Sequence, residues 1–310
     1  MNQLLKTISS LLFSTLLLLM GSCIKENMED CPQIHFFFSY MANGESNVIG
    51  DYIDDGILYV FNYSDGQYIN KFPVSKMQLT SKESFSISLP EGRYRVVCWG
   101  NASTNTLLPN SKSLDESLVG HPDYKDELSV LSTNDHLYYA SSELTVQSGK
   151  SSLCEVAFIS AHINLEVYVK NLVDIPIIEF HHLTPLYDFE MNAVYPYSVS
   201  YRPQVNIDIE NKQYSARFQT LRFATDNPIT MEILNSSGVS VYQLALADFM
   251  AKNELYRRTD TRTITTEGIN ELTIAILVEF KGLDVNVSIP DWEAGDVVPT
   301  SIAMQENVNN

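Results

Sequence analysis

The sequence predicts an all-β protein in which two tandem β-sandwiches follow an export signal. Many short segments alternate between apolar and polar residues, clusters of Gly, Pro, Asn and Asp separate them, and both halves of the chain share this pattern. A hydrophobic content of 45% is enough for buried cores and excludes a generally disordered chain. We therefore expect an N-terminal sandwich domain over residues 34–160 and a C-terminal one over residues 161–310.

The N-terminus has the order of a secretory signal peptide over residues 1–22. Lys6 supplies a positive charge, an apolar run follows, and Gly21-Ser22 provides small residues for cleavage. The apolar run is about half of the ~20 residues that a spanning helix needs. Cys23 comes next, an arrangement similar to the lipobox of bacterial lipoproteins, so we expect cleavage before Cys23 and its modification with diacylglycerol and a further acyl chain such as palmitate. The alternative is an ordinary signal peptide followed by a free cysteine.

In the N-terminal half, alternation and turn residues predict the strands. A lipidated polar tether over residues 23–33 leads into an aromatic strand and keeps it close to the membrane. The Asp65-Gly66 turn predicts a hairpin. The turn at residues 90–92 is expected to send one strand back antiparallel to the strand before it. The predicted strands span residues 34–40, 58–61, 68–69, 85–89 and 94–99.

Residues 100–135 have no clear period and are expected to be a loop with one short helix over residues 114–118. Alternation resumes after this loop and continues to the late Trp292. A second short helix is expected over residues 245–252. The remaining predicted strands span residues 137–140, 143–146, 153–159, 163–169, 205–209, 214–218, 230–234, 239–244, 272–278 and 285–289.

Three cysteines remain after the lipidation site: Cys31, Cys98 and Cys154. Outside the cytoplasm one pair of them could form a disulfide, and the sequence does not choose among the three pairings. Buried free thiols are an equal alternative for Cys98 and Cys154, because both lie in apolar strands.

We find no residues that predict catalysis, and we expect no enzyme activity, no cofactor and no metal. The chain has no Gly-x-Ser-x-Gly elbow, no His-Glu-x-x-His and no Gly-rich phosphate loop. His181 and His182 are adjacent, so on a strand they would point to opposite faces and could not share a metal; an edge strand or a solvated turn is their expected place. A net charge of −18 also excludes nucleic acid as an expected partner.

Several segments together resemble the FimB-type fimbrial anchor family of Bacteroidales (fimbrillin superfamily lipoproteins). The matching segments are Glu29-Asp30-Cys31-Pro32 after Cys23, the strand over residues 34–40, the strand and turn over residues 58–66, Gly92-Arg93-Tyr94 leading to Trp99-Gly100, and the strand ending at Trp292. The resemblance implies two transthyretin-like β-sandwich domains without enzyme activity. It also implies a lipoprotein of the cell outer membrane at the base of a fimbrium (pilus), which holds the shaft by strand addition, serves cell adhesion and limits fimbrial length.

A tip or shaft fimbrillin subunit and a surface glycan-binding lipoprotein are the alternatives. In shafts of this superfamily an arginine-specific protease removes the N-terminal strand with its lipid. Here the first arginine is Arg93, inside a predicted strand, so we expect the lipid and the first strand to stay and the protein to be a terminal anchor. A tail after Trp292 is a possible donor strand through Val297, Val298, Ile302 and Met304, or a frayed polar terminus.

Overall fold

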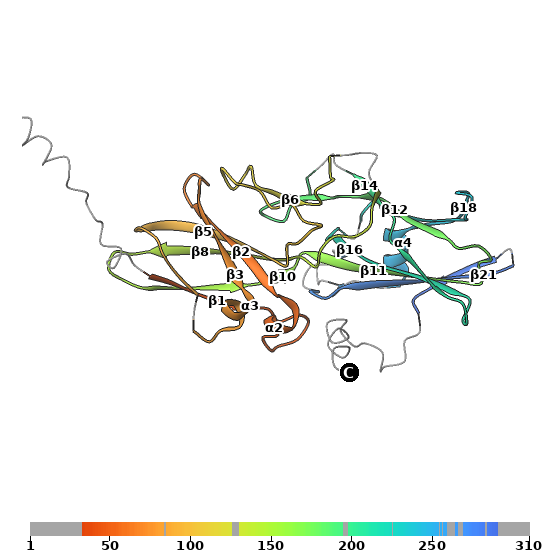
Figure 1. The fold of residues 1–310 in the computed structure, drawn as a ribbon, viewed down its shortest axis with the longest axis horizontal. Coiled ribbons are helices and arrows are strands. Elements are labelled where there is room, and N and C mark those ends of the chain that lie inside the picture. The colour runs from red at the N-terminus through yellow and green to blue at the C-terminus, as the bar shows by residue number, and fades with distance from the viewer. Residues whose placement is uncertain are drawn as a thin grey trace, which may run out of the picture.

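Two pairs of facing β-sheets lie end to end along the long axis of the molecule (Figure 1). The computed structural model describes residues 33–290, apart from residues 84, 126–129, 195–197, 225, 254, 256, 259–263, 266–268 and 283. Strands dominate this part of the chain, which confirms the all-β class. Among the described residues, no helix is both long and apolar enough to cross a membrane.

The first pair of sheets encloses the core of the N-terminal half. A three-stranded sheet, β4-β1-β9, faces a five-stranded sheet, β10-β8-β5-β2-β3, and alternate side chains from both meet between them. The smaller sheet contains β1 (Gln33–Ser39), β4 (Phe85–Ser88) and β9 (Ser152–Ala157). The larger contains β2 (Asp55–Asn62), β3 (Tyr68–Ser75), β5 (Gly92–Gly100), β8 (Tyr138–Val146) and β10 (Ile159–Ser160). Two short helices, α2 (Ile49–Tyr52) and α3 (Lys76–Thr80), add Ile49 and Leu79 to the same core.

The second pair of sheets encloses the core of the C-terminal half. One sheet, β15-β16-β11-β21-β22, contains β11 (His162–Lys170), β15 (Val205–Asp208), β16 (Gln213–Leu221), β21 (Thr273–Lys281) and β22 (Asp284–Ser288). The other, β18-β17-β12-β14-β7, contains β7 (Val130–Leu131), β12 (Ile177–Leu183), β14 (Val199–Tyr201), β17 (Thr230–Leu234) and β18 (Ser240–Ala245). Helix α4 (Leu246–Lys252), where the sequence predicts one, adds three apolar side chains to this core. A small sheet pairs β19 (Arg257–Arg258) with β20 (Ile264–Thr265).

Strands also pair between the two halves. β6 (Leu118–Gly120) pairs with β13 (Leu186–Asp188), and β7 pairs in parallel with β14. Phe189, just after β13, packs on Tyr59 and Trp99 on the outer face of the five-stranded N-terminal sheet. This sheet is therefore covered on both faces there, which explains why residues 58–61 form an unbroken apolar run. Whether residues 34–160 and 161–310 are separate domains stays a prediction.

Two local predictions are wrong. β5 does not pair with β4: β4 pairs with β1, and β5 lies between β2 and β8. Leu89 and Tyr94 are both buried in the core between the two sheets, so the chain crosses from one sheet to the other at Pro90 instead of turning back within one. Residues 114–118 form turns and the start of β6 rather than a helix, because Leu118 pairs with Asp188, far away in the sequence.

Candidate functional site

The first described strand, β1, lies inside the N-terminal sandwich rather than at an edge. It runs antiparallel to β4 on one side and parallel to β9 on the other. Ile34, Phe36 and Phe38 point into the core, whereas His35 and Phe37 alternate with them on the other face. Removing β1 would separate β4 from β9 and open the core between them.

Arg93, the first arginine of the chain, lies in β5, which is the central strand of its sheet. Its guanidinium carbon lies 3.5 Å from the centroid of the Tyr63 ring, and its Nη2 donates to Glu143 Oε2 at 2.6 Å. The peptide bonds around Arg93 therefore belong to the folded core sheet. The guanidinium also covers one face of Tyr63, so that face is not free to stack on a sugar ring.

Among the predicted cysteine sites, Cys98 and Cys154 are buried free thiols on opposite sheets of the N-terminal core. Burial raises the pKa of the Cys154 thiol to about 11 and raises that of Cys98 as well. Thiols held in the neutral form inside a core are chemically inert. Cys23 and Cys31 lie outside the described residues, and so does the tail with Val297, Val298, Ile302 and Met304.

A polar junction joins the two halves around Glu271. The Tyr138 hydroxyl donates to Glu271 Oε1 at 3.2 Å, and the Tyr40 hydroxyl donates to the same oxygen. Burial is the main cause that raises the pKa of Glu271. Beside it, Arg222 donates to the Ser160 carbonyl at 2.9 Å. These contacts fix the end of the loop before β21 against the N-terminal half.

His162 is the most deeply buried histidine of this junction. Its Nδ1 donates to the Leu137 carbonyl at 2.9 Å, and its ring lies edge-on to His136 with centroids 4.9 Å apart. Burial, together with a smaller effect of the nearby His136, lowers the pKa of His162 to about 3. His162 is therefore neutral at physiological pH, and it acts in packing rather than in proton transfer.

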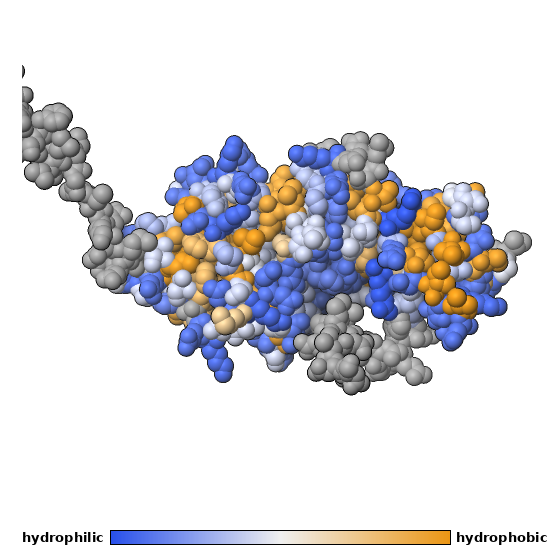
Figure 2. Space-filling model, in the orientation of Figure 1, coloured by the Kyte–Doolittle hydropathy of each residue, from blue (hydrophilic) through white to orange (hydrophobic). Residues whose placement is uncertain are grey.

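The end of the C-terminal half that lies farthest from the junction exposes aliphatic side chains. The ends of β11 and β21 lie together, because Lys170 pairs with both Gln213 of β16 and Glu279 of β21. Val173 and Ile175 lie between β11 and β12, and Ile209 lies between β15 and β16. Val239 lies in the turn between β17 and β18, beside the start of β12. All four are exposed at this end, Val173 by 94% and Ile209 by 84%. Figure 2 shows apolar side chains gathered over this end of the molecule, away from β1. We call Val173, Ile175, Ile209 and Val239 the far-end patch.

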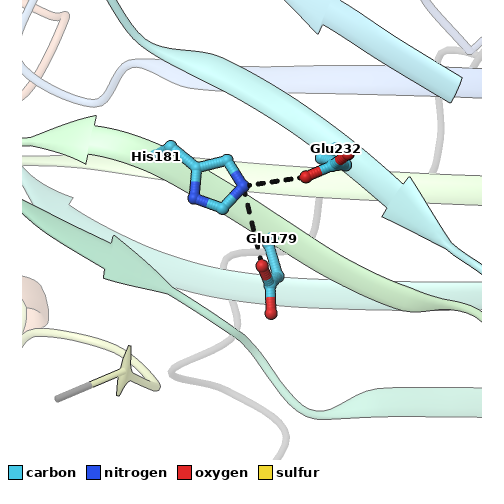
Figure 3. Close-up of side chains that lie close together, drawn as sticks. All are labelled: Glu179, His181 and Glu232. Atoms are coloured by element: carbon cyan, nitrogen blue, oxygen red, sulfur yellow. Dashed lines mark hydrogen bonds and ion pairs between the residues drawn. The ribbon is translucent and has the colours of Figure 1, made fainter. Parts of the chain in front are cut away.

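His181 and His182 lie on β12, which is an interior strand of its sheet and not the edge strand or solvated turn expected from the sequence. A bulge between Phe180 and Leu183 breaks the alternation, and His182 has a positive φ of 66°. His181 faces Glu179 from its own strand and Glu232 from β17 (Figure 3). No sequence spacing indicated this cluster, because Glu232 comes from a different strand.

Comparison with known proteins relates the chain and its fold to fimbrial proteins. The family model of the fimbrillin-A associated anchor proteins Mfa1 and Mfa2 matches residues 28–297. No curated protein matches the chain in sequence. The solved structures that share the fold include the fimbrial anchor protein Mfa2 from Porphyromonas gingivalis, a putative adhesin from Bacteroides ovatus and a putative adhesin from Bacteroides thetaiotaomicron.

The likeness to these structures extends over most of each chain at low sequence identity. For Mfa2 the identity is 15%, with a TM-score of 0.63 over 83% of this chain and 95% of that one. For the adhesin from Bacteroides ovatus the values are 16%, 0.68, 84% and 94%, and for that from Bacteroides thetaiotaomicron 17%, 0.65, 83% and 96%. These structures confirm the β-sandwich class. The match over residues 28–297 confirms the resemblance to fimbrial anchors, and the chain belongs to the family of fimbrillin-A associated anchor proteins Mfa1 and Mfa2.

Proposed function

We propose that this protein is the anchor subunit of a fimbria, held in the outer membrane by lipid on Cys23. It holds the shaft at the cell surface, limits the length of the shaft and performs no catalysis. The family supports a role at the fimbria on the cell surface. The observation that favours an anchor over a shaft subunit is the position of β1, in the middle of its sheet, together with the position of Arg93.

A shaft subunit would have to lose its first strand and still keep a folded body. An arginine-specific cut in this chain would fall at Arg93 or later. A cut at Arg93 would divide the central strand of the five-stranded sheet and separate β2 and β3 from the rest of the chain. Because such a cut damages the sandwich, β1 and the lipid ahead of it stay with the protein.

The shaft partner would then bind at the end away from the lipid. β1 enters the fold at one end of the molecule, and the far-end patch lies at the other (Figure 1). Exposed aliphatic side chains gathered at one end favour burial against another protein. We propose that the first shaft subunit covers the far-end patch and that strand addition supplies the remaining contacts.

Replacing Cys23 with serine tests the anchor function. The expected result is loss of the protein from the outer-membrane fraction and release of fimbriae into the medium, because no lipid would hold them. Cys31→Ser is the matched control and should leave fimbriae attached to cells. Finding a mature form that lacks Cys23 in assembled fimbriae would contradict the proposal and favour a tip or shaft subunit.

Blotting sheared fimbriae and membranes for this protein separates the anchor from the alternatives. An anchor stays with the membrane fraction, whereas a tip or shaft subunit leaves with the sheared fimbriae.

Deletion of residues 297–310 tests whether the tail donates a strand. Normal attachment of the shaft to the truncated protein would exclude that role.

A further inference from the structure

Two glutamates lie directly opposite each other on the outer face of the sheet β18-β17-β12-β14-β7. Glu179 of β12 and Glu232 of β17 are register partners, so their side chains project from the same face. Glu179 is buried, and Glu232 is partly buried. Like charges placed opposite each other on neighbouring strands destabilise a sheet, and partial burial strengthens the repulsion. Arg202 supplies one positive charge to this pair through Glu179, which leaves one negative charge to balance.

His181 supplies a nitrogen at the point where the two carboxylates meet (Figure 3). It lies two residues after Glu179 on β12, which returns its side chain to the same face. Its Nε2 lies 3.2 Å from Glu232 Oε2 and 3.6 Å from Glu179 Oε2. Tetrahedral zinc with bonds of about 2.0–2.1 Å places neighbouring ligand atoms about 3.3–3.4 Å apart. The two distances from His181 are close to this spacing, and the three ligand atoms all lie within 4.8 Å of one another.

Each of the three side chains is also held from outside by its other polar atom. Arg202 Nε donates to Glu179 Oε1 at 2.7 Å, and Gln243 Nε2 donates to Glu232 Oε1 at 2.8 Å. His181 Nδ1 lies 2.8 Å from Ser200 Oγ. Metal-binding sites in proteins use outer partners of this kind to orient their ligands. In the tautomer that places the ring proton on Nδ1, three electron-rich atoms converge with no proton between them.

We propose that Glu179, His181 and Glu232 bind one Zn²⁺, with water or a donor atom from a bound partner in the fourth position. One imidazole nitrogen with two carboxylate oxygens suits zinc, whereas calcium takes six to eight oxygen ligands and magnesium six in octahedral geometry. Arg202 occupies only the outer oxygen of Glu179, so it does not block the inner one. The competing arrangement is a hydrogen bond from His181 Nε2 to Glu232 Oε2 without a metal.

Zinc at this place would join β12 to β17 beside the bulge between Phe180 and Leu183. The same sheet contains β14 and β7, through which the segment before residue 135 joins the C-terminal half. A metal that fixes the β12–β17 pair would therefore stabilise the sheet on which the two halves meet. This role is independent of the anchor function.

The test is zinc binding by the purified protein, prepared without a polyhistidine tag and stripped of metal by a chelator. Isothermal titration with zinc chloride should give one site, and zinc should raise the midpoint of thermal unfolding. His181→Asn should weaken binding at least 100-fold and abolish the thermal shift. His182→Asn is the matched control, because it makes the same change at the next residue and suits a positive φ; it should leave binding unchanged.

Glu232→Gln tests the second strand, and it should weaken zinc binding as well. Circular dichroism of each variant shows whether it is folded. Calcium chloride in large excess should not compete with zinc. Absence of stoichiometric zinc binding would overturn the proposal and leave the Arg202 ion pair and the His181–Glu232 hydrogen bond to compensate the two carboxylates. Equal zinc affinity of the His181→Asn variant would also overturn it, because the ion would then be bound elsewhere, for example by thiols.

Discussion

Replacing Phe36 with alanine should destabilise the protein by about 3–5 kcal/mol. The side chain is 1% exposed and lies in the middle of β1, between β4 and β9. Its ring centroid lies 6.4 Å from that of Phe38 and 6.1 Å from that of Phe85, so truncation removes a ring that these neighbours surround. A loss of this size is a large share of the ~5–15 kcal/mol that stabilises a typical domain. It would show that β1 is a structural part of the sandwich and not a removable segment.

Urea unfolding monitored by circular dichroism measures this effect as a shift of the midpoint at unchanged slope. Phe37→Ala is the matched control: the same change one residue along β1, on the other face, where the ring is 39% exposed. We expect it to change stability by no more than about 0.5 kcal/mol. Equal effects of the two substitutions would refute the argument that β1 is held through its inward face, and with it the main support for the anchor proposal.

Three further predictions concern the junction and the strand pairing between the halves. The folded protein binds a proton at His162 more weakly than the unfolded chain does, so stability that is present above pH 6.5 is lost as the pH falls toward 3. Between pH 8 and pH 5 the free energy of unfolding should fall by about 2 kcal/mol. The His162→Phe variant should lack this part of the pH dependence in urea unfolding. A pH dependence equal in both proteins would contradict this. Burial raises the pKa of Glu271, so the stability that its protonated form contributes is lost as the pH rises through the folded pKa. The Glu271→Gln variant should therefore gain stability relative to the natural protein between pH 4 and pH 8. A constant difference between the two proteins in the same assay would show that the pKa of Glu271 does not change on folding. A Cβ atom at Gly120 would lie 2.2 Å from the Pro185 carbonyl oxygen, so Gly120→Ala should cost about 1–3 kcal/mol, whereas Gly44→Ala, with its nearest atom at 3.7 Å, should be close to neutral in thermal unfolding.

The strands with clear alternation were predictable because their side chains face one core and one solvated or half-covered surface. β1 and β16 are examples, and so is the hairpin of β2 and β3 at Asp65-Gly66. β12 was not predictable from its period, because Ile178, Glu179 and Phe180 are all buried and a bulge follows them. Its buried glutamate is compensated by Arg202, which follows β14 and forms an ion pair with it.

The errors in pairing have a similar cause. The turn at residues 90–92 is compatible with a hairpin, and only the burial of Leu89 and Tyr94 between two sheets shows that the chain crosses at that point. β6 and β7 are strands of three and two residues whose partners come from the other half of the chain. The candidate metal site has the same origin, since Glu232 lies 51 residues from His181 and meets it only through the register of β12 and β17.

The position of β1 also determines how the protein would bear mechanical load. A fimbria that is pulled away from the cell would place tension between the far-end patch and the tether ahead of Gln33. That tension acts on β1 from its own end, roughly along the strand, as its direction in Figure 1 indicates. The backbone hydrogen bonds to β4 and β9 are then loaded together in shear, and they must break almost at once rather than one after another. An edge strand peeled from a sheet yields at much lower force, so a central first strand would suit the anchor function proposed above, in which the protein withstands drag on a long filament.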